Sequence, residues 1–109
     1  MPVERLDKMK MELRRGALVL AVLAALRQEF YAYALRKRLS DAGLEVDEGT
    51  LYPLVRRLEE YGLLVSEWRR HEGRKRRYYK TSAEGLKLFG ELKAEAANLN
   101  ESLIKLIKG

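Results

Sequence analysis

The feature that most constrains the fold of this chain is a change in hydrophobic spacing near Gly62. Before it, apolar residues recur at helical intervals. After it, two short segments, 63–71 and 75–81, have the character of β-strands. Residues 72–74 separate them and include a glycine, and two short strands around a glycine turn predict a β-hairpin. The sequence therefore predicts a mainly helical α+β fold with one hairpin late in the chain.

Two helical segments open the chain. Residues 9–27 are rich in Met, Leu, Ala and Glu and contain no proline, which predicts a single helix. From Gly16 to Leu26 this helix is apolar on nearly every side, so we expect it to be buried. Gly16 either permits the close approach of a neighbour or is merely tolerated. Residues 31–41 predict a shorter helix, with one face formed by Tyr31, Leu35 and Leu39.

A third helix is predicted within residues 47–61. Four apolar residues at helical spacing predict its buried stripe: Leu51, Leu54, Val55 and Leu58. Its start is ambiguous. Asp47 is a good N-cap, whereas a cap at Thr50 would place Pro53 among the amides that need no partner.

The last helix is predicted to begin after a cap at Thr81 or Ser82 and to run to about Lys108. Six of its residues form a heptad seam: Phe89, Leu92, Ala96, Leu99, Leu103 and Leu106. Such a seam could pack on the chain's own first helix, but at a C-terminus it favours a dimer face. We therefore expect residues 1–81 to form one domain and residues 82–109 a dimerisation helix.

The net charge of +6 is concentrated in the hairpin. Residues 69–80 contain seven Lys or Arg and one Glu, whereas acidic and basic residues cancel in the rest of the chain. A local basic stripe is typical of a protein that binds a polyanion. The alternative interpretation is a solvated hairpin in a well-charged protein.

Several classes of function are disfavoured by composition. The chain has no cysteine and one histidine, His71, so we expect no disulfide, no metal site and no cofactor. Glu59 and Glu60 are adjacent and project about 100° apart, so they form no facing catalytic pair. Without a catalytic group of residues, we expect that the protein is not an enzyme. The uncharged stretch 16–26 is too short to span a membrane, and no signal peptide is evident, so we expect a cytoplasmic protein.

Three helices followed by a two-stranded hairpin is the order of a winged helix-turn-helix domain. In such a domain the third helix enters the major groove of double-stranded DNA, and the hairpin is the wing. The positive charge of this chain lies on the element that would follow the DNA backbone. Element order and charge location thus agree, and together they predict a DNA-binding protein.

Seven stretches of the chain match the pattern of one known family: Glu12–Leu18, Tyr31–Leu35, Glu48–Leu54, Arg57–Glu59, Gly62–Leu64, Arg77–Tyr79 and Glu84–Gly85. Through these stretches the chain resembles the PadR-type transcriptional regulators along nearly its whole length, in the shorter branch that has a single C-terminal helix. The resemblance implies a homodimeric regulator, usually a repressor, that dimerises through this helix. It also implies that a small effector can release the protein from DNA, as in many members of the family, although some have none known.

The outward face of the third helix supplies the first candidate DNA contacts. Thr50 and Tyr52 are expected to meet base edges and phosphates, although Tyr52 could instead pack on Pro53. Gly49 either lets the backbone approach a phosphate or simply starts the helix. Arg56 and Arg57 lie further along, and Arg57 is alternatively a partner of Glu60.

The wing supplies the second set of contacts, for which we expect Arg74, Lys75 and Arg76 at the turn to reach the DNA backbone or minor groove. Arg69 and Arg77 are alternatively spent on Glu67 or Glu72 across the hairpin. Trp68 is expected to pack in the core or to support the dimer helix, and its other possible role is to stack on an effector.

Two functions remain open at this point. One is a dimeric, sequence-specific transcriptional regulator that binds double-stranded DNA. The other is a winged-helix interaction module whose basic wing binds an acidic protein.

Overall fold

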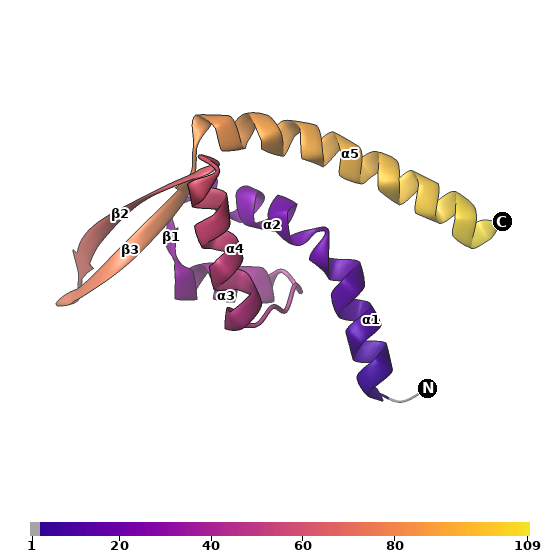
Figure 1. The fold of residues 1–109 in the computed structure, drawn as a ribbon, viewed down its shortest axis with the longest axis horizontal. Coiled ribbons are helices and arrows are strands. Elements are labelled where there is room, and N and C mark those ends of the chain that lie inside the picture. The colour runs from indigo at the N-terminus through magenta and orange to yellow at the C-terminus, as the bar shows by residue number, and fades with distance from the viewer. Residues whose placement is uncertain (1–2) are drawn as a thin grey trace.

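The computed structural model describes residues 3–109, which fold into five helices and three short strands. Helices α2, α3 and α4 form the body, and the hairpin and the two terminal helices extend from it (Figure 1). This arrangement confirms the expected mainly helical α+β class. In chain order the elements are α1 (Val3–Arg15), α2 (Leu18–Ala25), β1 (Phe30–Tyr31), α3 (Ala32–Asp41), α4 (Glu48–Glu60), β2 (Leu64–His71), β3 (Arg74–Thr81) and α5 (Ala83–Lys108).

The single helix expected over residues 9–27 is wrong: the segment forms two helices, α1 and α2, separated by a turn at Gly16 and Ala17. A Cβ on Gly16 would meet no other atom of residues 3–109 within 4 Å, so within this part of the chain the glycine is not needed for a close approach. The break has a physical reason. α2 is apolar and enters the core, whereas α1 is amphipathic and buries no residue, so the two segments do not continue as one buried helix.

A two-residue strand, β1, was not expected from the sequence. It pairs antiparallel with β3, with Phe30 opposite Tyr79 and Tyr31 opposite Tyr78, which gives a sheet of order β1-β3-β2. Tyr31 has extended backbone and caps α3, so that helix begins at Ala32. Two residues are too few to show a strand pattern.

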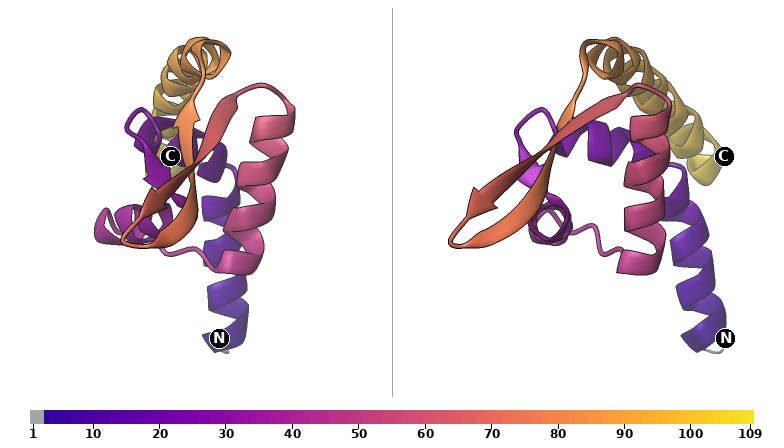
Figure 2. Two further views of the ribbon diagram at one scale, coloured as in Figure 1. Left: turned by 90° about the vertical axis from the view of Figure 1, so that its left-hand side faces the viewer. Right: turned by 60° about the vertical axis from the view of Figure 1, so that its left-hand side comes forward.

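The predicted hairpin is confirmed, and it projects from the helical body as a long twisted ribbon (Figure 2). β2 and β3 pair continuously from Leu64 opposite Thr81 to His71 opposite Arg74, so β3 begins one residue earlier than expected. The connecting Glu72 and Gly73 have positive φ angles of 53° and 77°. Positive φ at both central residues is the geometry of the tight turn that matches the twist of paired strands. We call β2 and β3 the wing.

The core lies between α2, α3, α4 and the base of the wing. All four residues of the stripe predicted on α4 are buried. Asp47 is the N-cap of α4, which resolves the ambiguity at its start, and Pro53 lies inside the helix. The twelve buried apolar residues are Leu18, Val22, Leu23, Leu26, Leu35, Leu39, Leu51, Leu54, Val55, Leu58, Leu64 and Tyr79.

The terminal helices only partly join this body. Ser82 caps α5, and Phe89 and Leu92 pack on the core in its first half. Beyond Ala96 the helix extends away, as does α1, on the same side of the molecule (Figure 1). The radius of gyration is 15.8 Å, against about 13 Å for a globular domain of this length.

Thr81 is a buried link between the wing and α2. Its hydroxyl donates to the carbonyl of Leu23 over 2.9 Å, and its amide donates to the carbonyl of Leu26 over 2.8 Å. We expect Thr81→Val to lower the free energy of unfolding by about 1–3 kcal/mol, because it leaves a buried carbonyl unpaired. Denaturant unfolding measures this, with Thr81→Ser as the control that keeps the hydroxyl. Equal losses in both variants would show that packing, not the hydrogen bond, is responsible.

Candidate nucleic-acid interface

The N-terminal turn of α4 is organised by Asp47. The amide of Thr50 donates to Asp47 Oδ2 over 3.1 Å, and the Thr50 hydroxyl donates to Oδ1 over 2.8 Å. The hydrogen bond from the Thr50 hydroxyl is the main reason that the pKa of Asp47 is lowered. Gly49 is exposed, and a Cβ there would lie 3.0 Å from Asp47 Oδ2. Gly49 thus leaves room for the cap, and the Thr50 hydroxyl keeps only its acceptor side free.

Tyr52 lies half-buried on the next turn and packs against the core. With Arg56 and Tyr79 of β3 it lines a hollow of about 150 Å³, so this face of α4 adjoins the base of the wing. Burial, and then the Glu48 carboxylate, raise the pKa of Tyr52. The phenol is therefore protonated at neutral pH and able to donate a hydrogen bond to a phosphate or a base.

The other expected cations of this surface divide into two groups. Arg56 and Arg57 on α4, and Arg74 and Lys75 at the wing turn, are exposed, and none of them forms an ion pair within residues 3–109. Arg76 differs. It is half-buried, with its guanidinium 4.2 Å from the centre of the Tyr31 ring. Of these five cations, all but Arg76 are thus available to a polyanion.

Two further wing arginines are occupied. Arg69 bonds to Glu67, as one alternative predicted, and also to Glu29 outside the hairpin. Arg77 bonds to Glu59 on α4 rather than to Glu67 or Glu72. Glu29 and Glu59 were missed because no local pattern marks a partner that the fold brings from another element.

Trp68 does not pack in the core, so that expectation is wrong. Its side chain is 56% exposed on β2, opposite Arg77, whose guanidinium lies 5.5 Å from the ring centre. The physical reason is that the wing extends beyond the body, where no element covers it. Apart from Leu64, no β2 residue is buried.

Comparison with known proteins agrees with this geometry. The model of the transcriptional regulator PadR-like family matches residues 19–91. The chain belongs to the PadR-like family of transcriptional regulators. The matched residues run from α2 through the wing into the first half of α5, so the family spans the candidate interface.

Individual relatives cover most of the chain. The transcriptional regulator Rv3488 of Mycobacterium tuberculosis is 44% identical over 75 residues, which are 68% of this chain and 70% of the relative. A PadR family regulator from Eggerthella lenta has a structure with a TM-score of 0.88 and 45% identity, covering 95% of this chain and 93% of that one. A PadR-like regulator from Bacillus cereus has a TM-score of 0.81 and 29% identity, covering 90% and 98%.

Residues 3–109 of this PadR-like chain include neither a helix that could span a membrane nor a group of side chains that could hold a metal ion. Within them no helix is long and apolar enough to cross a membrane. Within them, also, no three His, Cys, Asp or Glu side chains come together as a metal ion requires.

Proposed function

We propose that this regulator is a homodimer that binds a specific sequence of double-stranded DNA, with α4 in the major groove and the wing on the backbone. The observation that carries the proposal is a set of exposed cations on both elements that form no ion pair with any of residues 3–109: Arg56, Arg57, Arg74 and Lys75. Two recognition helices per dimer imply half-sites about one helical turn apart, roughly 34 Å, or a multiple of this distance. Residues 1–81 then serve DNA binding, and residues 82–109 serve dimerisation.

The homodimer is supported by two apolar faces that the single chain leaves exposed. α1 buries no residue, although Val3, Leu6, Met9 and Leu13 lie along it. The second half of α5 exposes another set: Leu99, Leu103, Ile104, Leu106 and Ile107. Apolar side chains of this number on two extended helices are typical of a surface that a partner covers. A second copy supplies the matching faces by symmetry.

The heptad seam on α5 therefore has two parts. Phe89 and Leu92 pack on the chain's own core, and Ala96 is half-buried. Leu99, Leu103 and Leu106 are exposed, and in the proposal they form the dimer contact.

The finer parts of the proposal are repression, release by a small effector and action in the cytoplasm. They are supported by membership of the PadR-like family and by the proposed DNA partner. Trp68, exposed on the wing, is the residue that we assign to effector stacking. Quenching of its fluorescence by a compound that also releases DNA supports this assignment.

The decisive experiment is fluorescence anisotropy of labelled duplexes at several salt concentrations. We expect the protein to prefer DNA from upstream of its own gene over a scrambled duplex by at least about 10³-fold, with affinity falling steeply as salt rises. Equal and salt-sensitive binding to every duplex tried, including fragments selected from the whole genome, contradicts the proposal. That result favours the interaction module, whose wing binds an acidic protein.

Arg74 and Tyr52 are expected to play different parts in DNA binding. We call the preferred duplex from upstream of the protein's own gene the operator. Arg74→Ala should weaken binding to operator and to scrambled DNA about equally, because it removes a phosphate contact. It should also reduce the slope of log affinity against log salt concentration by about 1 per protomer. Tyr52→Phe keeps the packing, and it should reduce the preference for operator at least about fivefold because it removes the hydrogen-bond donor.

The matched control for Arg74→Ala is Lys87→Ala, an exposed cation of α5 that pairs with Glu84. It removes the same charge away from the proposed surface and should leave both affinities nearly unchanged. Equal losses on both duplexes for the Tyr52 and Arg74 variants would show that the two residues do not divide base and backbone contacts.

A further inference from the structure

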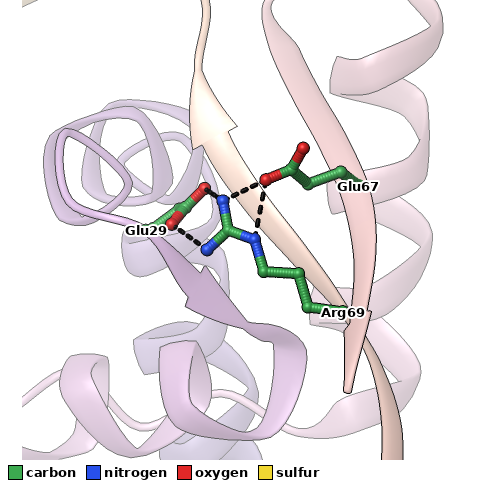
Figure 3. Close-up of polar contacts among 3 residues, drawn as sticks. All are labelled: Glu29, Glu67 and Arg69. Atoms are coloured by element: carbon green, nitrogen blue, oxygen red, sulfur yellow. Dashed lines mark hydrogen bonds and ion pairs between the residues drawn. The ribbon is translucent and has the colours of Figure 1, made fainter. Parts of the chain in front are cut away.

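A group of charged residues that we call the wing clamp connects β2 with the segment just before β1: Glu29, Glu67 and Arg69 (Figure 3). Arg69 Nη1 and Nη2 donate to the two oxygens of Glu29 over 2.5 and 2.6 Å, and Arg69 Nε donates to Glu67 Oε1 over 2.7 Å. Arg69 Nη2 also bonds to Glu67. Glu29 lies just before β1, forty residues from Arg69 in the chain, so the clamp joins β2 to the opposite edge of the sheet.

Aromatic contacts continue the clamp along the same face of the wing. The Arg69 guanidinium lies 5.2 Å from the centre of the Tyr78 ring, and Tyr78 meets Tyr31 of β1 edge-to-face at 5.6 Å. Arg76, directly opposite Arg69, lies over Tyr31. Two arginines in facing positions repel each other. The two carboxylates on Arg69 offset that repulsion.

The opposite face of the wing is tied to α4. Arg77 Nε donates to the Ser66 hydroxyl over 2.8 Å, and Arg77 Nη2 donates to Glu59 over 3.3 Å. Ser66 also donates to Glu59. The base of the wing is therefore fixed between β1 on one side and α4 on the other, while its far turn remains exposed.

We propose that Arg69 is a positioning residue for DNA binding, and that the wing clamp sets the angle between the wing and α4. This inference rests on the proposed function, since it assumes that both elements contact one DNA duplex. The bidentate fork of a guanidinium fixes direction as well as distance, which a single point charge does not. Arg69 thus acts through the position of Arg74 and Lys75 rather than through a phosphate contact of its own.

If the clamp orients the wing, the Glu29 carboxylate strengthens operator binding, although its negative charge repels DNA. Glu29 and Glu67 place two negative charges on one arginine in the outer half of the wing. If the wing served only as a source of positive charge, removal of either carboxylate would strengthen binding to every duplex. If the clamp orients the wing, removal of Glu29 weakens operator binding. The two interpretations therefore predict opposite signs.

The first test compares Glu29→Gln with Glu72→Gln by fluorescence anisotropy. Glu72 is highly exposed at the wing turn, outside the clamp, so its variant adds the same charge without freeing Arg69. We expect Glu72→Gln to strengthen binding to operator and to scrambled DNA about two- to fivefold. We expect Glu29→Gln to weaken operator binding about fivefold or more and to leave scrambled DNA unchanged or tighter. Tighter operator binding by Glu29→Gln would overturn the proposal.

A charge-neutral variant gives an independent test. Arg69→Lys keeps the net charge but cannot bond in a fork to two carboxylates. We expect it to weaken operator binding to a similar extent as Glu29→Gln. Operator affinity equal to that of the unaltered protein would show that Arg69 acts only through its charge, contrary to the proposal.

The clamp can also be measured without DNA, because Trp68 is the sole tryptophan and lies on β2 beside Arg69. Time-resolved anisotropy of Trp68 should show a larger nanosecond component in Glu29→Gln and Arg69→Lys than in Glu72→Gln, at unchanged melting temperature. No change in this motion would overturn the clamp even if the protein binds its operator. Increased motion in a protein without sequence preference would support the clamp and contradict the proposed function.

Discussion

Gly85→Ala is expected to lower the melting temperature by about 12–24 °C. A Cβ at this position would lie 2.1 Å from the backbone oxygen of Leu63 and 2.7 Å from Thr81 Cγ2, closer than real atoms approach. The Leu63 carbonyl cannot easily retreat, because it also accepts the amide of Ser82 over 3.0 Å. A clash with backbone in a packed site costs about 3 kcal/mol, and one kcal/mol shifts the melting temperature of a domain this size by about 4–8 °C.

Gly90→Ala is the matched control within the same helix. A Cβ at Gly90 would meet nothing within 4 Å, so the change should stabilise the protein by about 0.5–1 kcal/mol through helix propensity. Thermal unfolding followed by circular dichroism measures both variants. A melting temperature for Gly85→Ala within a few degrees of that of the unaltered protein would contradict the close docking of α5 on the junction of α4 and β2.

Leu103→Glu is expected to convert the proposed dimer into a monomer of 12.6 kDa and to reduce operator affinity at least about 100-fold. Leu103 lies in the exposed half of the heptad seam, between Leu99 and Leu106. A dimer would bury two new carboxylates against apolar side chains without partners, at a cost of several kcal/mol. A monomer loses the advantage of two linked half-sites, which accounts for the loss of affinity.

Analytical ultracentrifugation measures the mass, and anisotropy measures the affinity. Ala94→Glu is the control, since it adds the same charge on the opposite side of α5 from the seam, at an exposed position. It should remain dimeric and bind the operator normally. A Leu103→Glu protein that still sediments as a dimer would show that the exposed half of the seam is not the contact.

Local signals explain why much of the fold was predictable. The α4 stripe and the glycine turn at residue 73 each depend on neighbours within a few positions, so spacing and residue type were sufficient. The sequence left two candidate caps at the start of α4 and of α5, and the structure selects Asp47 and Ser82. The break at Gly16 was missed because helix propensity is high on both sides of it. Only the different burial of α1 and α2 separates them.

The candidate interface was predictable only in part, because some of its contacts join residues far apart in the chain. The charge count located the wing and the helical periodicity located the outward face of α4. Neither could distinguish a cation that is available to DNA from one already occupied, because the partners lie in other elements. Arg74 is exposed at the turn, whereas Arg76 stacks on Tyr31 and Arg69 bonds to Glu29.

The sequence by itself determined that α4, the hairpin and α5 follow one another, which residues of α4 are buried and where the positive charge lies, since all three follow from residue type and spacing along the chain. The tertiary structure alone decided which wing arginines are spent on anchoring, why residue 85 is a glycine and which half of the α5 seam is left uncovered. These features depend on contacts between residues far apart in the chain. Hydrogen bonds and steric contacts act over a few ångströms in space, and no pattern in the local sequence records them.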